Sequence, residues 1–445
     1  MRRPLAFVAV LVLASFGALS AAPGHEAAAT NSPAYRVEDL GILPGDYASV
    51  AMGINEKGDV VGWSIGPGGT RAFLYTAGAG MTALPAPPGR PVTFARAVND
   101  TRTVVGVASA GGTDIGRAVR WRAGTALDLG TLGTGSFSDA YDVNAAGAIV
   151  GSSYTSGGSL LGIHAFRHTA ASGLVDLTPG VDAAAAGGIN DSGQVAGYRN
   201  GRAFRRDGAT FVDLGVPAGF ARSFGSAINA SGQVAGHVST ASGNAERIVR
   251  YTDGVGMVVL GGQGEFNRAF GINAGGDFVG QGRPPGEAVR QGFIFTDAAG
   301  MRGLNSLIAP DSGWFVIGAS GINDAGQIAG WASGPAGQRA VRLVPIDEPD
   351  PAGPPAPPSR LRGRVLSPLQ VRLTWIDNSD DETRFGIQRA VGANGSFVPL
   401  ARVGADVTRY SDRSVTPGTT YRYRVRAENA AGRSAWSNTV VVAIP

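Results

Sequence analysis

The chain contains no cysteine among its 445 residues, and Lys57 is its only lysine. The missing cysteine excludes disulfides, thiol nucleophiles, thiolate metal sites and a cysteine-linked lipid anchor. Glycine and proline, at 69 and 26 residues, are too frequent for a protein of long helices. The arginines recur at matched positions and form no block, so the net charge of +4 does not indicate nucleic-acid binding. The sequence therefore predicts a β-rich protein that is stabilised by packing alone.

The short motifs of common catalytic chemistries are also missing. We find no G-x-S-x-G, P-loop, dinucleotide-binding or HExxH pattern, and no calcium-loop spacing of aspartates. His164 and His168 have the spacing of a metal pair on one strand face, but His164 stands where the repeats described below mostly have arginine. The run Asp380-Asp381-Glu382 is typical of a solvated turn. We expect no catalytic residue, metal or cofactor, although an acid/base pair assembled from distant segments would leave no motif.

Residues 1–29 have the pattern of a secretory signal peptide. Arg2 and Arg3 precede an apolar run, and small residues follow it. We expect cleavage between Ser20 and Ala29. The alternative, a membrane anchor, would need a longer apolar run. The sequence thus predicts a secreted or periplasmic protein with no membrane span after cleavage, and we expect a monomer.

A ten-residue pattern such as GINDSGQVAG (188–197) recurs seven times. In each copy an asparagine is preceded directly by Ile or Val and four residues earlier by Ala or Gly, and a glycine follows seven residues later. The asparagines are Asn55, Asn99, Asn144, Asn190, Asn229, Asn273 and Asn323, and the glycines are Gly62, Gly106, Gly151, Gly197, Gly236, Gly280 and Gly330. Successive asparagines are 39 to 50 residues apart. A β-rich repeat of this length is typical of a β-propeller.

Each repeat reads as four strands, which we call a, b, c and d. Strand a ends at the asparagine, whose side chain is expected to bond its own downstream backbone, and a glycine three residues later supplies positive φ. Strand b contains the invariant glycine, and strands c and d carry sequences like RAF and DLG. The mature chain starts with a lone d strand at 35–41, and the repeats end on a c strand at 339–344. We therefore predict an all-β, seven-bladed β-propeller over residues 34–346, closed by its N-terminal strand.

Three segments give the repeats a family resemblance: GINDSGQVAG, HAFRH (164–168) and LDLGTLG (127–133). With these segments the chain resembles the HAF family of bacterial extracellular repeats over residues 37–343. The resemblance implies an extracellular repeat protein and little about its biochemistry.

The last hundred residues have a different pattern. Residues 347–358 form a Pro-rich linker, and 359–445 contain short alternating strands spaced as in a β-sandwich. This part resembles a fibronectin type III domain. Trp375 stands at the position of the early core tryptophan, and Tyr421 stands at the tyrosine-corner position, where its hydroxyl would bond back to the chain.

Connection lengths predict the binding face. The a–b turn has one length in all seven repeats, whereas the b–c and d–a loops vary and lie on the opposite face. Five aromatic residues in or beside these loops are our candidate binding residues: Trp63, Tyr198, Trp314, Phe315 and Trp331. We expect exposed rings that bind an extracellular polysaccharide or protein without catalysis. Two alternatives stay open: the rings fill gaps between blades, or the protein is a polysaccharide lyase or glycosidase.

Overall fold

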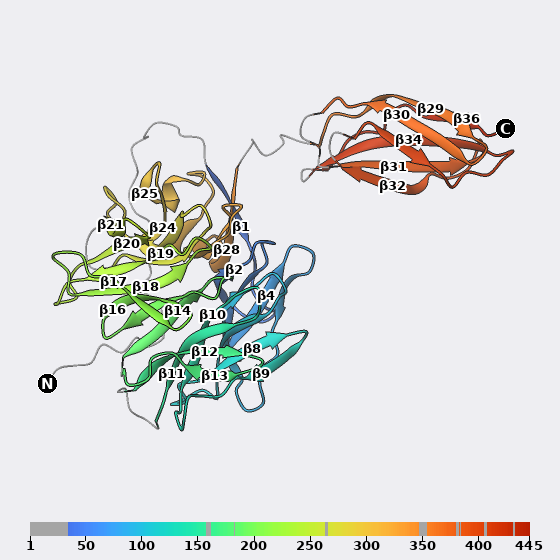
Figure 1. Ribbon diagram of the computed structural model, residues 1–445. Helices are drawn as coiled ribbons and strands as arrows, with labels where there is room; N and C mark the ends of the chain where they lie inside the picture. Colours follow the sequence, from blue (N-terminus) through green and yellow to red (C-terminus); the bar gives the residue numbers. More distant parts are fainter. Residues whose placement is uncertain are drawn as a thin grey trace. The chain divides into compact units, whose positions relative to one another are not determined.

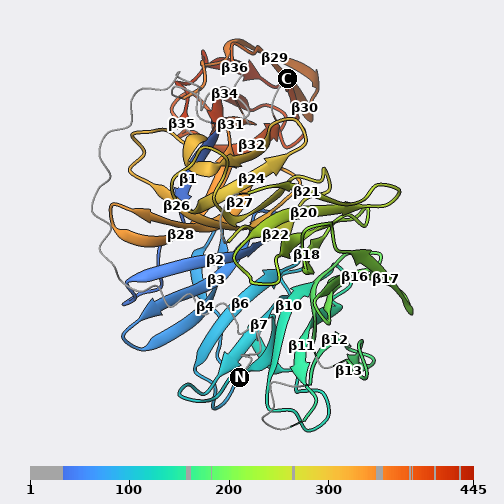
Figure 2. The same cartoon turned by 90° about the vertical axis from the view of Figure 1, so that its left-hand side faces the viewer.

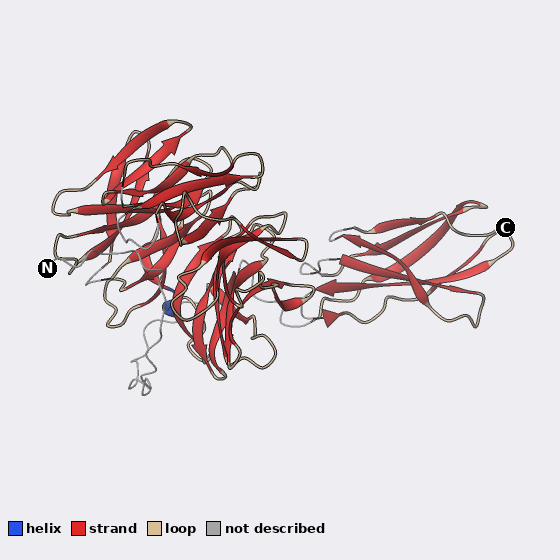
Figure 3. Ribbon diagram, turned by 90° about the horizontal axis from the view of Figure 1, so that it is seen from below, coloured by secondary structure: helices blue, strands red, loops and turns tan. Residues whose placement is uncertain are grey.

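The computed structural model describes residues 34–156, 162–181, 183–262, 266–346, 354–379, 382, 384–404, 407–429 and 432–445. It divides the chain into two units, Met1–Pro345 and Ile346–Pro445. The expected signal peptide lies outside the described residues, as does 347–353 of the expected linker. Strands dominate both units, and the 3₁₀ turn η1 (Leu304–Ser306) is the helical element of the described residues (Figure 3). The predicted all-β class is confirmed. No helix in the described part has the length and hydrophobicity needed to cross a membrane.

The first unit contains seven four-stranded antiparallel sheets (Figure 1). Sheets one to four are β2 (Ala48–Ile54), β3 (Val60–Gly66), β4 (Gly69–Thr76) and β5 (Gly80–Ala83); β6 (Val92–Val98), β7 (Val104–Ser109), β8 (Arg117–Arg122) and β9 (Thr125–Asp128); β10 (Ser138–Val143), β11 (Ile149–Tyr154), β12 (Ile163–Thr169) and β13 (Gly173–Asp176); β14 (Ala184–Ile189), β15 (Val195–Arg199), β16 (Arg202–Asp207) and β17 (Thr210–Gly215). Sheets five to seven are β18 (Arg222–Ile228), β19 (Val234–Ser239), β20 (Glu246–Thr252) and β21 (Gly256–Gly261); β22 (Arg268–Ile272), β23 (Phe278–Gly282), β24 (Gln291–Thr296) and β25 (Gly300–Gly303); β26 (Phe315–Ile322), β27 (Ile328–Gly334) and β28 (Gly337–Pro345), completed by β1 (Tyr35–Asp39).

The seventh sheet joins both ends of the repeat region. Its order is β1-β28-β27-β26, so the first strand of the described residues pairs with the last strand of the repeats. The register runs antiparallel from Tyr35 opposite Pro345 to Asp39 opposite Val341. The predicted pairing of the N-terminal strand with the segment at 339–344 is confirmed.

Neighbouring sheets share their hydrophobic cores. Seven clusters of buried side chains each combine residues of two adjacent sheets, and one of them joins the first sheet to the seventh. In that cluster Phe73 of β4 packs with Ala329 of β27 and Ala340 of β28. The first strands of successive sheets contact one another, and β26 contacts β2. In Figure 2 several of these first strands, β2, β6, β10, β18 and β22, lie toward the middle of the unit.

The second unit is a two-sheet β-sandwich. One sheet has the order β29-β30-β33, and the other has the order β32-β31-β34-β35 with β36 paired to β34. Its strands are β29 (Ser359–Ser367), β30 (Gln370–Ile376), β31 (Arg384–Val391), β32 (Val398–Gly404), β33 (Arg409–Asp412), β34 (Thr420–Asn429), β35 (Gly432–Arg433) and β36 (Val440–Ala443). Strand β30 shows the expected alternation, with Val371, Leu373 and Trp375 buried in the core.

Candidate functional site

The repeat asparagine closes the turn between strands a and b. In all seven repeats its Oδ1 accepts the backbone N–H of the residue four positions later, at 2.8 or 2.9 Å. The residue three positions later has φ between 58° and 85°; it is glycine in six repeats and Arg102 in the second. Both features of the predicted turn are confirmed.

The same asparagines also link neighbouring sheets through hydrogen bonds. These links were not predicted from the sequence. Six of them donate from Nδ2 to the backbone carbonyl oxygen of the next repeat's asparagine, at 2.9 to 3.1 Å. One of the six runs from Asn323 in the seventh repeat to Asn55 in the first. The buried asparagines thus hold the first strands side by side at one end.

The invariant glycine of strand b marks a close approach of two backbones. A Cβ added at any of the seven would lie 1.9 to 2.3 Å from a carbonyl oxygen of strand a. Gly62, for example, lies opposite Ala51, and its added Cβ would meet the carbonyl oxygen of Val50. The small residue four positions before the asparagine lies at this crossing, which explains why only Ala or Gly occurs there.

A β-bulge follows this crossing in the first strand of every sheet. The register shifts between the residues four and two positions before the asparagine. A bulge turns the extra residue out of the regular alternation. The seven extra residues comprise six residue types, and all line one cavity: Met52, Arg96, Tyr141, Gly187, Ser226, Phe270 and Ser320. A repeated backbone feature therefore places one variable residue of each sheet at the cavity, and six of the seven have a side chain there.

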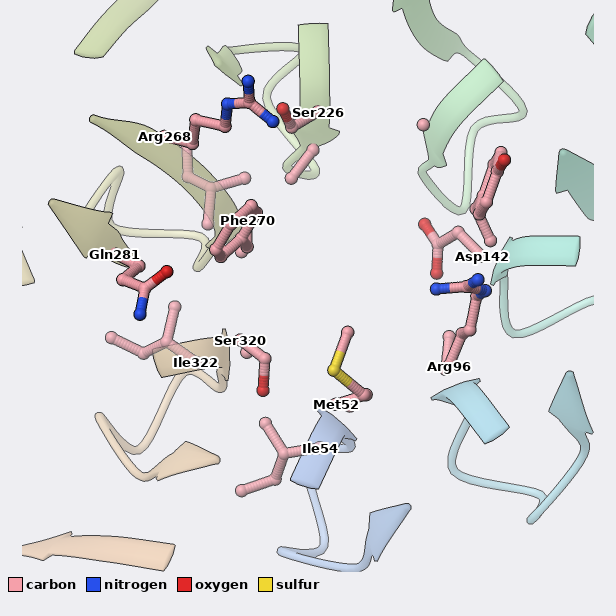
Figure 4. Close-up of a pocket in the computed structure, with 18 of the residues that line it drawn as sticks. Met52, Ile54, Arg96, Asp142, Ser226, Arg268, Phe270, Gln281, Ser320 and Ile322 are labelled. Atoms are coloured by element: carbon pink, nitrogen blue, oxygen red, sulfur yellow. The ribbon is translucent and has the colours of Figure 1, made fainter. Parts of the chain in front are cut away.

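The central cavity has a volume of about 370 Å³ and is lined by the first two strands of the sheets. Figure 4 shows Arg96 and Asp142 on one side of it and Arg268, Phe270 and Gln281 across from them. Much of the remaining lining is apolar or aromatic. This combination of apolar walls and a few polar groups is typical of a small-ligand site.

Arg96 of the second sheet is held in place by the third sheet. It donates from Nε and Nη2 to the two carboxylate oxygens of Asp139, at 2.8 and 2.6 Å. Asp139 is fully buried. The Arg96 guanidinium also lies 5.3 Å from the ring centroid of Tyr141, whose hydroxyl is 3.0 Å from Oγ of Ser152. Burial raises the pKa of Tyr141, so this hydroxyl stays protonated.

Asp142 is the single carboxylate lining the cavity among the described residues. Its Oδ2 accepts the backbone N–H of Ile189 in the fourth sheet, and its Oδ1 accepts that of Val143. Burial raises the pKa of Asp142 to about 6, and the nearby charge of Asp191 acts in the same direction. Asp142 therefore changes charge close to neutral pH.

The fifth and sixth sheets form the opposite side of the cavity. Arg268 donates to both carboxylate oxygens of Glu246, at 2.9 and 2.7 Å, and its guanidinium lies 4.4 Å from the Phe266 ring centroid. The His237 ring stacks on Phe224 at 4.7 Å, and burial lowers the pKa of His237 well below its usual range. The arginines at both sides are thus charge-compensated, which favours a neutral ligand over an anion.

Three of the five predicted binding aromatics line this cavity: Trp63, Tyr198 and Trp331. The prediction that these rings are exposed is wrong for Trp63 and Trp331, which are only 7% exposed and pack with Val50. The residue after the invariant glycine pairs with strand a and faces the interior. Tyr198 is half-buried beside Phe224, and burial raises its pKa to about 12.

Trp314 and Phe315 lie elsewhere. Trp314 packs against the cluster shared by sheets six and seven, and its ring covers Gly334 closely enough to exclude a Cβ there. Phe315 begins β26 opposite Ser333 and is half-buried. Neither lines the central cavity. The sequence signal for the cavity is therefore the position three before the asparagine, whose variability stands out between nearly invariant neighbours.

Several arginines of strand c pair with aspartates of strand d. Arg202 lies 2.8 Å from Asp213, and His164 takes the arginine position with its Nδ1 2.7 Å from Asp176. Arg71 instead pairs with Asp46 at 2.8 Å. The described ranges contain no group of three or more His, Cys, Asp or Glu side chains placed to hold a metal ion.

In the sandwich, Trp375 and Tyr421 both lie in the core. The Trp375 ring is tilted against Phe385 at 5.6 Å. The Tyr421 hydroxyl accepts the backbone N–H of Thr416 at 3.0 Å, which confirms the expected tyrosine corner. Asp380 and Asp381 of the acidic run lie outside the described residues.

Comparison with known proteins identifies the second unit. Residues 356–443 match the fibronectin type III domain family. Over 88 residues the chain is 39% identical to human receptor-type tyrosine-protein phosphatase F, a match that covers 19% of this chain and 4% of the phosphatase. A solved Fn3-like protein from Clostridium thermocellum is 25% identical and covers 20% of this chain and 94% of its own, with a TM-score of 0.19. A solved structure of titin kinase and its flanking domains is 28% identical over 20% of this chain and 16% of its own, also with a TM-score of 0.19.

Proposed function

We propose that the first unit is a closed seven-bladed β-propeller of HAF-type bacterial extracellular repeats. Three observations support closure: β1 completes the seventh sheet, a hydrophobic cluster joins sheets seven and one, and Asn323 bonds to Asn55. Removing 34–41 would take away β1 and expose the edge of β28. Such a truncated protein is expected to lose cooperative unfolding of the whole unit in a thermal melt. A melt like that of the intact chain would contradict closure.

We further propose that this propeller is a secreted or periplasmic, non-catalytic binding protein. Its ligand is an uncharged portion of an extracellular polysaccharide or a protein segment, bound at the central cavity and the variable loops around it. The observation that carries the proposal is the bulge, which places one residue of each sheet at one cavity, with aromatic, charged, polar and apolar types among them. Aromatic rings with few uncompensated charges suit stacking against sugar rings.

The alternative function, a polysaccharide lyase or glycosidase, is favoured by one observation. Asp142 has a pKa of about 6 and lines the cavity, as a general acid would. However, glycosidases commonly use two carboxylates, and both oxygens of Asp142 already accept backbone N–H groups. A lyase base at Tyr141 is opposed by its raised pKa. Binding without catalysis is the better explanation of this geometry.

A glycan array probed with the full-length protein would test the proposal. Phe270 lies at the bulge position and is half-buried, so Phe270→Ala should weaken binding at least about fivefold through lost ring contact while the fold is retained. Trp314→Ala is the matched control, because it removes an aromatic ring outside the cavity. Equal binding by both variants would contradict the cavity site. Chain cleavage of any bound polysaccharide by the purified protein would favour the enzyme.

A further inference from the structure

The outer face of one sandwich sheet carries a compact group of arginines. Arg362 and Arg364 alternate with inward-facing residues of β29, Arg372 lies on β30, and Arg409 lies on β33. All four are exposed. We call these four residues the arginine face. Because strands are about 4.8 Å apart and alternate residues about 6.6 Å apart, the four side chains share a small area.

The register places these charges against one another. Arg364 lies directly opposite Arg372, and Arg362 and Arg409 both lie opposite Thr374. Like charges directly opposite each other on neighbouring strands destabilise a sheet. Among the described residues, none of the four arginines makes an ion pair or a side-chain hydrogen bond that would offset this repulsion.

Several arginines on the other sheet of the same unit form ion pairs. Arg384, Arg426 and Arg433 all lie within 3.5 Å of the Glu428 carboxylate, which is nearly fully buried. Arginines on the other sheet of this unit are therefore neutralised by a carboxylate, whereas those of the arginine face have no carboxylate partner among the described residues. The imbalance extends to composition, since residues 354–445 contain thirteen arginines and seven carboxylates, against 38 basic and 34 acidic residues in the whole chain.

An anionic polymer would supply the missing partners. The guanidinium group has a planar fork of donors that matches carboxylate and sulfate oxygens in pairs. Thr374 and Ser411 lie between the arginines on the same face and offer hydroxyl groups for hydrogen bonds to sugar hydroxyls. No outward position of these three strands holds an aromatic ring in the described residues, whereas single-stranded nucleic acid is usually bound by stacking.

We propose that the arginine face binds an acidic polysaccharide, a linear chain that carries carboxylate or sulfate groups. The arginines lie on three neighbouring strands of one open face, which an extended polymer can cross, and electrostatic complementarity supplies the affinity. This second site lies within the fibronectin type III domain and does not depend on the cavity of the first unit. The chain would then bind a neutral ligand at the cavity of the first unit and an acidic polysaccharide at the arginine face.

The test is binding of the full-length protein to immobilised heparin and polygalacturonate at several salt concentrations. The double variant Arg364→Gln/Arg372→Gln should lower the affinity about tenfold, because two exposed charge-assisted contacts are lost. The slope of log affinity against log salt should fall by roughly 2, one for each lost contact. The matched control is Arg402→Gln/Arg433→Gln, which removes the same charge from the other sheet and should change affinity less than about twofold.

Several outcomes would overturn the proposal. These are no binding to either polymer, an equal loss in both double variants, or tighter binding to duplex DNA or to phosphatidylglycerol vesicles than to both polysaccharides. Thermal melts check folding, and the single variant Arg372→Gln replaces the double if that one unfolds. Glycan-array binding that depends on Phe270 should be unchanged in the double variant, so failure of this proposal and failure of the cavity site are distinguishable.

Discussion

The side-chain amide of Asn323 donates a hydrogen bond of 3.1 Å to the backbone carbonyl oxygen of Asn55, 268 residues earlier in the chain. The same bond links Asn190 to Asn229 at 3.0 Å between neighbouring repeats. One local interaction thus serves both consecutive repeats and the two ends of the repeat region. Comparing its contribution at these two places tests whether the link between the seventh and first sheets stabilises the unit as much as a link between consecutive sheets.

Replacing these asparagines by aspartate should destabilise the first unit by about 2 kcal/mol each, because the amide donor is lost and a carboxylate faces a carbonyl oxygen. We expect similar losses for Asn190→Asp and Asn323→Asp in urea denaturation. Asn244→Asp, at an exposed position, is the control and should be neutral. A loss at Asn190 with none at Asn323 would mean that the link between the seventh and first sheets contributes nothing.

The invariant glycine gives a second prediction. In Gly197→Ala the new Cβ would lie 2.1 Å from the backbone carbonyl oxygen of Ala185, so the two strands must separate. We expect a loss of at least about 3 kcal/mol, or no folded protein. Gly78→Ala is the matched control, because a Cβ there meets nothing within 4 Å, and its effect should stay within about 0.5 kcal/mol. A thermal melt of each variant measures both, and equal stability would disprove the crowded crossing.

The sequence predicted the features that depend on local backbone constraints. The turn at Asn190 follows from residue types that only certain conformations accept, and the pairing of Tyr35–Asp39 with the last repeat strand follows from the order of the strands in the repeats. The backbone constraint at the turn recurs in every repeat, so the same residue types recur at the same positions of the amino-acid sequence. The tyrosine corner at Tyr421 was predictable from the resemblance of residues 359–445 to a fibronectin type III domain.

The cavity was not predictable, because its geometry depends on bulges and long-range pairs. The bulge between Ala51 and Gly53 changes the face of Met52, and the variability of this position among the repeats does not by itself specify a bulge. The ion pair of Arg96 with Asp139 joins residues 43 positions apart. Trp63 pairs with Val50, and its side chain faces the interior. Its ring is therefore buried, although the residue lies beside a variable loop.

Asp142 predicts a pH dependence of stability. Its pKa is raised from 3.8 to about 6 in the folded protein, so the folded state holds this proton more tightly than the unfolded chain. The free energy of unfolding should therefore fall as the pH rises from about 4 to 6, by roughly 2 kcal/mol from this group. Asp142→Asn should remove that decline, and its stability relative to the wild type should increase between pH 4 and pH 7.

Urea denaturation at pH 4, 5, 6 and 7 measures the effect. Asp311→Asn, which removes an exposed carboxylate, is the control and should follow the wild type at every pH. An Asp142→Asn curve parallel to that of the wild type would show that this carboxyl is not the titrating group.

The last prediction concerns the tyrosine corner of the second unit. Tyr421→Phe removes the acceptor of the Thr416 N–H group and leaves the buried ring in place. The unfolding transition of the fibronectin type III domain should lose about 1 kcal/mol, the usual net contribution of one hydrogen bond. Tyr410→Phe is the matched control: this ring packs against the same core, and its hydroxyl makes no hydrogen bond in the described residues. Denaturation of the full-length chain, followed by tryptophan fluorescence, measures both variants. Equal losses would mean that the hydroxyl of Tyr421 contributes no more than the small polarity change that both substitutions share, and the corner would then be held by packing of the ring alone.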